Sequence, residues 1–460
     1  MKTVIHWFRR DLRLTDNTAL HAAAHDAETV IPVYITSEWK HEHRWTGPAR
    51  QEFLCGCLDS LSKNLHHIGS RLIIRHGNAF EVLNQLIHET QAEAVYCNRD
   101  PDPFGRHVEQ QLEKLPCELR AFKDAALHER DEVLTTTNDP YRVFTPYSRA
   151  WLRLDKPAPQ PAVKHLKSPG PLPSDPLPTL ATWGLTSSAK VPEAGEKAAR
   201  QRMEQFFRRR ILHYGAARDL PSMPGTSQLS IDLRHGTLSP RELFAKAHHL
   251  LAGANATERK NIQTYINELA WREFYLQVLW HWPGVLDDEF NPKYRGLKWH
   301  HSKEKFARWC SGETGFPIVD AGMRQLNATG WMHNRVRMIT AMFLTKDLHL
   351  DWREGERYFM QRLVDGEIAS NNGGWQWSAG TGADAAPYFR IQNPWSQTAR
   401  YDTDAEYIKQ WVPELRDVEP TRLAKAPAPG TRLAKNYPEP IVDHAKERDV
   451  CLEMFREHTP

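Results

Sequence analysis

A proline-rich stretch divides this chain into two parts of different character. It covers residues 155–178, with the sequence DKPAPQPAVKHLKSPGPLPSDPLP. Proline lacks an amide donor and fixes its φ angle, so this stretch is excluded from the interior of a helix or sheet. We therefore expect a connector that lies over the surface, inside a linker that spans residues 131–195. A rigid docking motif for an SH3-like partner is the alternative.

Before this linker, residues 1–130 alternate short apolar runs with helical patterns. The helical patterns are clearest at residues 50–65 and 80–89. The alternation predicts an α/β domain with a Rossmann-like, five-stranded parallel sheet and helices on its faces. No G-x-G-x-x-G follows the first run, so the usual dinucleotide loop is not expected. The predicted strands are residues 3–8, 30–35, 71–75, 94–98 and 118–122.

After the linker, residues 196–460 have a helical pattern almost to the end. Ser239-Pro-Arg-Glu242 reads as a capping box with proline at the first helical position, which predicts a helix start. The second domain should therefore be all-α. Its clearest helical runs are residues 260–280, 302–310, 318–328 and 334–344.

Composition narrows the class of protein. At 460 residues the chain exceeds one ordinary core, so two or three domains are expected. A net charge of +3 does not by itself indicate affinity for nucleic acid, so any basic groove would have to be local. There is no run of about 18 apolar residues, and Arg9, Arg10 and Asp11 interrupt a signal peptide, so we expect a cytoplasmic protein without a membrane span. The six scattered cysteines lack metal-site spacing, which predicts reduced thiols and no metal.

Residues 351–394 gather the chain's most unusual chemistry. Asp365 and the paired amides of Asn371 and Asn372 fall close to Trp375 and Trp377, with two adjacent glycines between them. Glycine allows a close backbone approach or a positive φ angle. This combination suits a flat ligand with polar edges. The alternative is a glycine-broken helical connection whose tryptophans fill space.

Read with TGWMHNRVRMITAMFLTKDL just before it, this segment closely resembles the flavin-binding core of the photolyase/cryptochrome family. The resemblance extends from HWFRRDLRLTDNTAL to YPEPIVDHAKER and is closest to bacterial cyclobutane pyrimidine dimer (CPD) photolyases. It implies an antenna-binding α/β domain and an all-α domain for non-covalent FAD and DNA. A second chromophore, of the methenyltetrahydrofolate or 8-hydroxy-5-deazaflavin type, would lie near NRDPDPFGRHVE and the helix that begins near Arg50.

The resemblance also implies a set of FAD-binding residues. Hydroxyls and free amides in the loop PGTSQLS suit a phosphate, although the loop also reads as an ordinary turn. Arg272 would face the phosphates, Arg337 would pair with Asp365, and Asn371 would face flavin N5. The full set is Tyr214, Thr226, Ser227, Gln228, Leu229, Ser230, Tyr265, Glu268, Arg272, Asn334, Arg337, Asp365, Gly366, Glu367 and Asn371.

Two helical faces carry the expected catalytic groups. Glu268, Trp271 and Arg272 share one face, which could equally be a salt bridge against a packed ring. By resemblance, Trp271 stacks on a flipped-out pyrimidine, and a protonated Glu268 stabilises charge that develops on its carbonyl oxygens. Asn334 favours CPDs, because (6-4) photolyases carry histidine there. The expected catalytic set is Glu268, Trp271, Asn334, Met338, Asn371 and Trp377.

Further residues match an electron relay and a DNA surface. Three buried indoles could be ordinary core, but Trp299, Trp352 and Trp375 match the family's relay to photoexcited flavin. Two positions depart from the family pattern, because Glu367 replaces the second aspartate of D-G-D and Gln392 replaces a phenylalanine. The expected DNA contacts are Arg218, Trp271, Arg335, Trp377 and Arg390.

The expected function is light-driven repair of CPDs in DNA by a monomer that carries reduced FAD. A cryptochrome that signals through a partner and a (6-4) photolyase are the rival interpretations. Asn371, Glu268 and Met338 argue against the first, and Asn334 argues against the second. A helical scaffold without flavin is a remote third.

Overall fold

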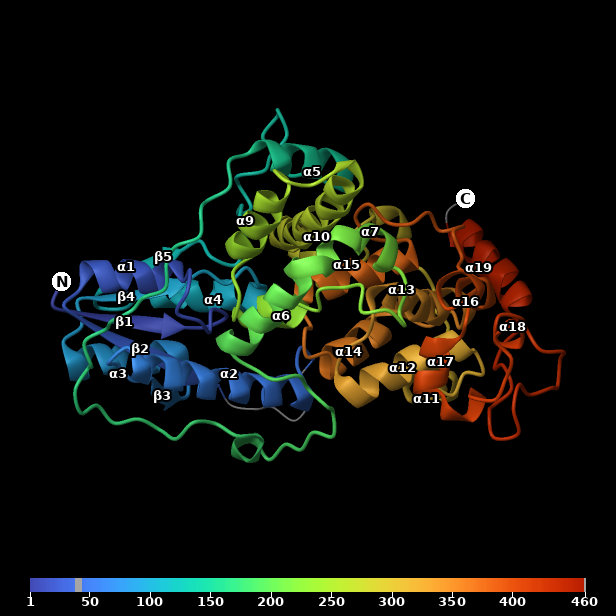
Figure 1. Cartoon of the computed structure of the whole chain (residues 1–460), viewed down its shortest axis with the longest axis horizontal. Helices are drawn as coiled ribbons and strands as arrows, with labels where there is room; N and C mark the ends of the chain where they lie inside the picture. The colour runs from blue at the N-terminus through green and yellow to red at the C-terminus, as the bar shows by residue number, and fades with distance from the viewer. Residues whose placement is uncertain (38–43, 459–460) are drawn as a thin grey trace.

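The computed structural model describes residues 1–37 and 44–458, and it shows a sheet domain beside a helical domain (Figure 1). The five strands are parallel in the order β3-β2-β1-β4-β5, which confirms the predicted sheet. β3 begins two residues later than expected. The strands are β1 (Thr3–Phe8), β2 (Thr29–Thr36), β3 (Ile73–His76), β4 (Ala94–Asn98) and β5 (Glu118–Phe122).

Alternate side chains of β1 face opposite layers of helices. Val4 and Phe8 pack in the cluster that contains α1 and α2, whereas Ile5 and Trp7 pack in the cluster that contains α3 and α4. Buried faces on both sides explain why the strands read as nearly continuous apolar runs. The helices are α1 (Thr18–Asp26), α2 (Pro48–His67), α3 (Ala79–Thr90) and α4 (Pro103–Leu112).

The proline-rich segment forms a long strap along the surface (Figure 1). It is fastened at intervals, because the amides of Val163, Leu166 and Asp175 donate to carbonyl oxygens of the sheet domain at 3.3, 3.0 and 2.9 Å. Further along, Lys190 donates to Ala328 of the helical domain at 2.8 Å. The range predicted as a linker also contains α5 (Phe144–Arg153), which packs against α10 (Ala256–His281). The domain bounds themselves stay a prediction.

The second domain is helical, as predicted, and α10 is its longest described helix. Asn255 and Glu258 form a reciprocal capping box at the start of α10. The capping box predicted at Ser239 is wrong in its second half, although the helix does begin at Pro240. Ser239 accepts from the amide of Arg241, while Glu242 pairs with Arg200 at 2.6 Å, a charge-assisted bond that outcompetes the backbone contact.

The remaining helices build two apolar cores that meet around α10 and α15. In the described part of the chain, no helix is both long enough and apolar enough to cross a membrane. The helices are α6 (Glu196–Arg209), α7 (Tyr214–Ala217), α8 (Ser230–His235), α9 (Pro240–Leu250), α11 (Lys303–Ser311), α12 (Pro317–Thr329), α13 (Asn334–Met342), α14 (Trp352–Arg362), α15 (Ile368–Ala379), α16 (Pro394–Tyr401), α17 (Glu406–Trp411), α18 (Pro420–Leu423) and α19 (His444–His458).

Helix α15 runs unbroken through the two adjacent glycines, so the alternative of a glycine-broken connection is wrong. Neither Gly373 nor Gly374 has a positive φ angle. A Cβ on Gly373 would lie 2.2 Å from the ring of Tyr275, so this glycine allows α15 to approach α10 closely. A Cβ on Gly374 would meet nothing within 4 Å.

Candidate flavin and lesion cavity

A cavity of about 520 Å³ opens in the helical domain between α7, α8, α10, α13, α14 and α15. It brings together residues that lie as far apart in the chain as Tyr214 and Trp377. Of the predicted site residues, Thr226, Gln228, Trp299, Trp352 and Arg390 do not line it. Those that do are Tyr214, Arg218, Ser227, Leu229, Ser230, Tyr265, Glu268, Trp271, Arg272, Asn334, Arg335, Arg337, Met338, Asp365, Gly366, Glu367, Asn371, Trp375 and Trp377.

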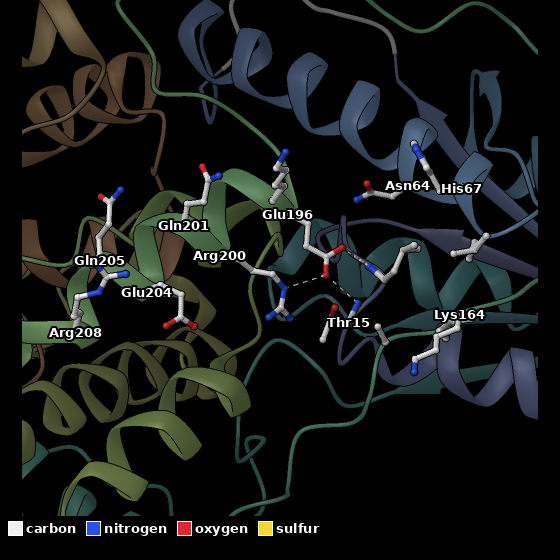
Figure 2. A pocket seen from close by; sticks show the side chains of 15 residues that line it. Thr15, Asn64, His67, Lys164, Glu196, Arg200, Gln201, Glu204, Gln205 and Arg208 are labelled. Carbon is white, nitrogen blue, oxygen red and sulfur yellow. Dashed lines mark hydrogen bonds and ion pairs between the residues drawn. The ribbon is translucent and has the colours of Figure 1, made fainter.

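A larger depression of about 930 Å³ lies between the end of α2, the connector and α6 (Figure 2). Its central acid, Glu196, accepts the amides of Leu14 and Thr15 at 2.9 and 3.1 Å and lies 3.6 Å from Arg200. The two amide bonds to Glu196 join α6 to the sheet domain, and the depression is open to solvent. Size alone therefore does not locate the site.

One end of the cavity is polar. Asp365 accepts two bonds from Arg337, at 3.1 and 2.9 Å, and a third from the hydroxyl of Ser230 at 2.7 Å. Ser230 begins α8, whose first turn has free backbone amides. The preceding loop turns at Gln228, which has a φ angle of 56°. The hydroxyls and amides of this loop and helix start suit a phosphate. The guanidinium of Arg337 is already paired with Asp365, the pair expected beside the flavin ring.

Glu367 lies deeper in the wall and is 7% exposed. It forms ion pairs with Arg272, with Nε 2.9 Å from Oε2, and with Arg10 of the sheet domain. Burial alone would raise its pKa, but the charges of Arg272, Arg10 and Arg234 lower the pKa to about 2. Glu367 is therefore ionised throughout the physiological range, and its side chain has a structural use beyond that of its backbone.

The part of the cavity wall around Trp271 is aromatic, and we name it the aromatic end. The ring of Trp271 stacks on Phe144 of α5, with centroids 3.6 Å apart and planes at 8°, and it also packs against Tyr275. Phe144 therefore backs one face of the indole and fixes its plane. The sequence interpretation missed Phe144, because it lies 127 residues before its partner and inside the predicted linker. Its signal was the aromatic pattern FTPYSRAW.

Charged groups surround this aromatic end. Arg218 donates to Glu268 at 2.6 Å, and Arg335 donates to Asp219 at 2.8 Å and lies over the ring of Tyr401. Arg390 is exposed and outside the cavity wall. Two of the arginines predicted to contact DNA therefore lie at the cavity, each paired with a carboxylate.

Comparison with known proteins identifies the family to which the chain belongs. A family model described as the FAD binding domain of DNA photolyase matches residues 265–457, and one described as DNA photolyase matches residues 4–164. The chain belongs to the photolyase/cryptochrome family. It is 40% identical to a deoxyribodipyrimidine photo-lyase of Synechococcus sp. over 96% of this chain and 94% of that protein. It is 39% identical to the Escherichia coli enzyme of that name, over 99% and 98%.

Solved structures of the family share the fold along the whole chain. A bacterial class III photolyase from Agrobacterium tumefaciens superposes with a TM-score of 0.91 at 38% identity and covers 100% of this chain and 98% of its own. A cryptochrome from Synechocystis sp. superposes with a TM-score of 0.88 at 27% identity and covers 99% of each chain. This protein is therefore an FAD-binding DNA photolyase by full-length likeness.

The donor set of the photolyase cavity fits FAD. Ser227, Ser230 and Arg272 suit the diphosphate end, whereas bare Gly374 leaves room beside the indoles for a flat ring. The side-chain nitrogen of Asn371 donates to the carbonyl oxygen of Glu356 at 3.1 Å. This bond fixes the amide so that its oxygen is left as an acceptor for a ligand N–H.

The three predicted relay tryptophans, Trp299, Trp352 and Trp375, lie in one core, and of the three only Trp375 lines the cavity. Trp375 lines the cavity, and its ring also contacts Phe359 and Trp309, with centroids 5.0 and 6.0 Å apart. Trp352 is fully buried and donates to Glu289 at 3.1 Å. Trp299 is 9% exposed. Trp309 is a fourth indole that the sequence interpretation did not select.

Several residues in the neighbourhood predicted for an antenna chromophore make contacts within the protein. Arg50 donates to the carbonyl oxygens of Trp45, Met360 and Leu363 at 2.6 to 2.9 Å. Asp100 and Asp102 both pair with Arg10. The type of second chromophore stays a prediction.

Proposed function

We propose that this photolyase splits cyclobutane pyrimidine dimers, with the damaged pair flipped into the cavity beside FAD. The supporting observation is that Glu268, Trp271, Asn334 and Met338 line the same cavity as Asn371. When bound, reduced FAD supplies the excited electron that opens the cyclobutane ring. The residues of this chain bind and orient the dimer and keep water away from it.

Each group at the aromatic end has a distinct role in this proposal. The indole of Trp271, held by Phe144, offers its face to the flipped base, and base–aromatic stacking contributes about 1–3 kcal/mol. Glu268 donates a proton in a hydrogen bond to a pyrimidine carbonyl, where negative charge develops during splitting. Arg218 and Arg335 leave their carboxylate partners to contact the phosphates beside the lesion.

The test is light-dependent repair of defined lesions. Purified protein with reduced FAD is given oligothymidine that contains either CPDs or (6-4) photoproducts, and recovery of thymine absorbance is followed under blue light. We expect recovery with the CPD substrate alone. The matched variant Asn334→His, at the position that separates the two lesion classes, should lose CPD repair. Recovery with (6-4) photoproducts, or with neither lesion, would contradict the proposal.

Blue-light signalling is the second candidate, because the cryptochrome from Synechocystis sp. shares the fold along the whole chain. Flavin photoreduction would then matter in place of lesion splitting. Absent repair with intact photoreduction would favour this candidate. For the repair function we further propose that the protein acts as a monomer on damaged DNA, which sedimentation with and without a CPD duplex would test.

A further inference from the structure

Glu367 belongs both to the flavin cavity and to the contact between the two domains. Its carboxylate lies at the cavity wall beside Arg272 of α10, where Arg272 also donates to the carbonyl oxygen of Ala125 at 2.6 Å. The same carboxylate accepts from Arg10, which follows β1 in the sheet domain. The buried side chain of Glu367 therefore contacts both the cavity wall and the sheet domain.

On the sheet-domain side, Arg10 is fixed by two further acids. Its Nη1 donates to Asp100 and Asp102, at 3.0 Å each. Asp102 also lies 3.5 Å from Arg234 of α8. Arg10, Arg234 and Arg272 thus form one largely buried network across the boundary with Glu367, Asp100 and Asp102. Arg9 and Glu109 extend it through Asp100. Removing one charged member leaves its partners with uncompensated charge, so the stability of each ion pair depends on the others.

The cavity loop is fastened to the sheet domain at a second point. Arg50 of α2 donates to the carbonyl oxygens of Met360 and Leu363, at 2.7 and 2.9 Å. A Cβ on Gly366 would lie 1.9 Å from the Arg50 guanidinium, so the loop rests directly on that side chain. The segment from 363 to 367 is therefore held by the sheet domain from behind while its front lines the cavity.

We propose that Glu367 couples the occupancy of the flavin cavity to the contact between the two domains. A ligand that orders the 365–367 loop and Arg272 also orders Glu367, and hence Arg10. By linkage, FAD then stabilises the domain contact, and the intact contact raises the affinity for FAD by the same factor. The inference rests on FAD binding and is independent of which lesion the photolyase repairs.

The length of the side chain is part of the inference. Glutamate reaches Arg10 with one carboxylate oxygen while the carboxylate also pairs with Arg272. Aspartate is one methylene shorter, so Glu367→Asp should keep one of these partners and lose the other. This departure from the family's D-G-D pattern therefore has a physical use in this chain.

The first test compares hydrogen exchange in the FAD-loaded protein and in apoprotein stripped of flavin. In the wild type, FAD should slow exchange in the sheet-domain loops 9–12 and 98–102, although neither lines the cavity. Glu367→Gln should bind FAD, as absorbance will report, yet lose this FAD-dependent protection. The matched control is Glu196→Gln, which weakens another contact between the domains outside the cavity and should keep the protection at both loops.

The second test uses a residue outside the cavity wall. Arg10→Ala should weaken FAD affinity by roughly tenfold, while Glu196→Gln leaves it unchanged. The FAD affinity of Arg10→Ala tests the coupling even if Glu367→Gln fails to bind FAD. The proposal is overturned if FAD leaves loops 9–12 and 98–102 unprotected in the wild type, if Glu367→Gln retains the protection, or if Arg10→Ala binds FAD normally. None of these readouts involves a lesion, so failure of dimer repair would leave them unaffected.

Discussion

Arg218 and Glu268 form an ion pair at the aromatic end of the cavity, with the donor nitrogen 2.6 Å from the acceptor oxygen. The residue expected to hydrogen-bond the flipped base and the residue expected to contact the phosphate are thus each other's partner in the DNA-free protein. Binding of a lesion has to exchange this pair for two new contacts.

The first prediction concerns Glu268→Gln. The amide still fills the space and donates a hydrogen bond to a pyrimidine carbonyl. We expect a splitting yield reduced by roughly tenfold or less, because one hydrogen bond to the developing charge is weakened and not removed. The splitting yield of a bound CPD under blue light measures this effect. A yield equal to that of the wild type would remove Glu268 from the contact with the base.

The second prediction concerns Arg218→Ala. Loss of one phosphate contact should weaken binding to all duplexes similarly and reduce the slope of log affinity against log salt by about 1. Titrations of a CPD duplex at several salt concentrations measure this slope. Lys303→Ala, an exposed cation on α11 outside the cavity wall, is the control and should leave the slope unchanged. Equal slopes for all three proteins would remove Arg218 from the DNA contact.

The third prediction compares the two neighbouring glycines. Gly373→Ala forces a Cβ to within 2.2 Å of Tyr275, so α15 has to move away from α10, with a cost of about 1–3 kcal/mol in the free energy of unfolding. Gly374→Ala meets nothing within 4 Å and should gain helix propensity of up to about 1 kcal/mol. Its methyl group enters the cavity, however, so FAD affinity should fall. Urea unfolding and flavin titration separate the two effects, and equal stability losses would contradict them.

The fourth prediction tests the relay. Trp375→Phe should abolish most photoreduction of oxidised flavin, because Trp375 is the one predicted relay indole that lines the cavity. Repair by protein whose flavin has been reduced chemically should persist. Trp309→Phe is the matched control, because its ring contacts Trp375 in the same core but lies outside the predicted route. Loss of photoreduction in Trp309→Phe would show that the electron passes through Trp309.

The fifth prediction concerns Glu356, which is fully buried on α14. Burial raises its pKa to about 7, with only partial opposition from the charge of Arg44. A carboxyl whose pKa is higher in the folded state favours folding at low pH, and this contribution is lost as pH rises through about 7. We expect a loss of up to roughly 3 kcal/mol between about pH 5 and about pH 8. Urea unfolding should show a smaller loss in Glu356→Gln, and an unchanged loss would assign it elsewhere.

Local patterns predicted the elements of the fold well. Each of the five strands has a β-branched or aromatic run, and α10 has a long helical pattern, so both were visible without tertiary information. The Ser239 capping box failed because Arg200, 42 residues away, attracts Glu242. A signal of four residues cannot report a competing partner from another helix.

The site was predictable only where a motif carried it. Asp365 and Asn371 stand in a segment with a specific pattern, whereas the stacking of Phe144 on Trp271 follows from how α5 docks on α10. The Arg10–Glu367 pair joins residues 357 positions apart. The sequence showed that Glu367 was unusual, but the partner that explains it became apparent only when the two domains were seen together.

The proline-rich strap, which is hydrogen-bonded to both domains, has a consequence for the transfer of light energy between chromophores. Dipolar coupling between two chromophores depends on their separation and on the angle between their transition dipoles. Because the strap is bonded to one domain at Val163 and Asp175 and to the other at Lys190, little slack main chain remains at the joint. Any chromophore bound to the sheet domain would therefore keep a constant orientation toward the flavin ring in the helical domain.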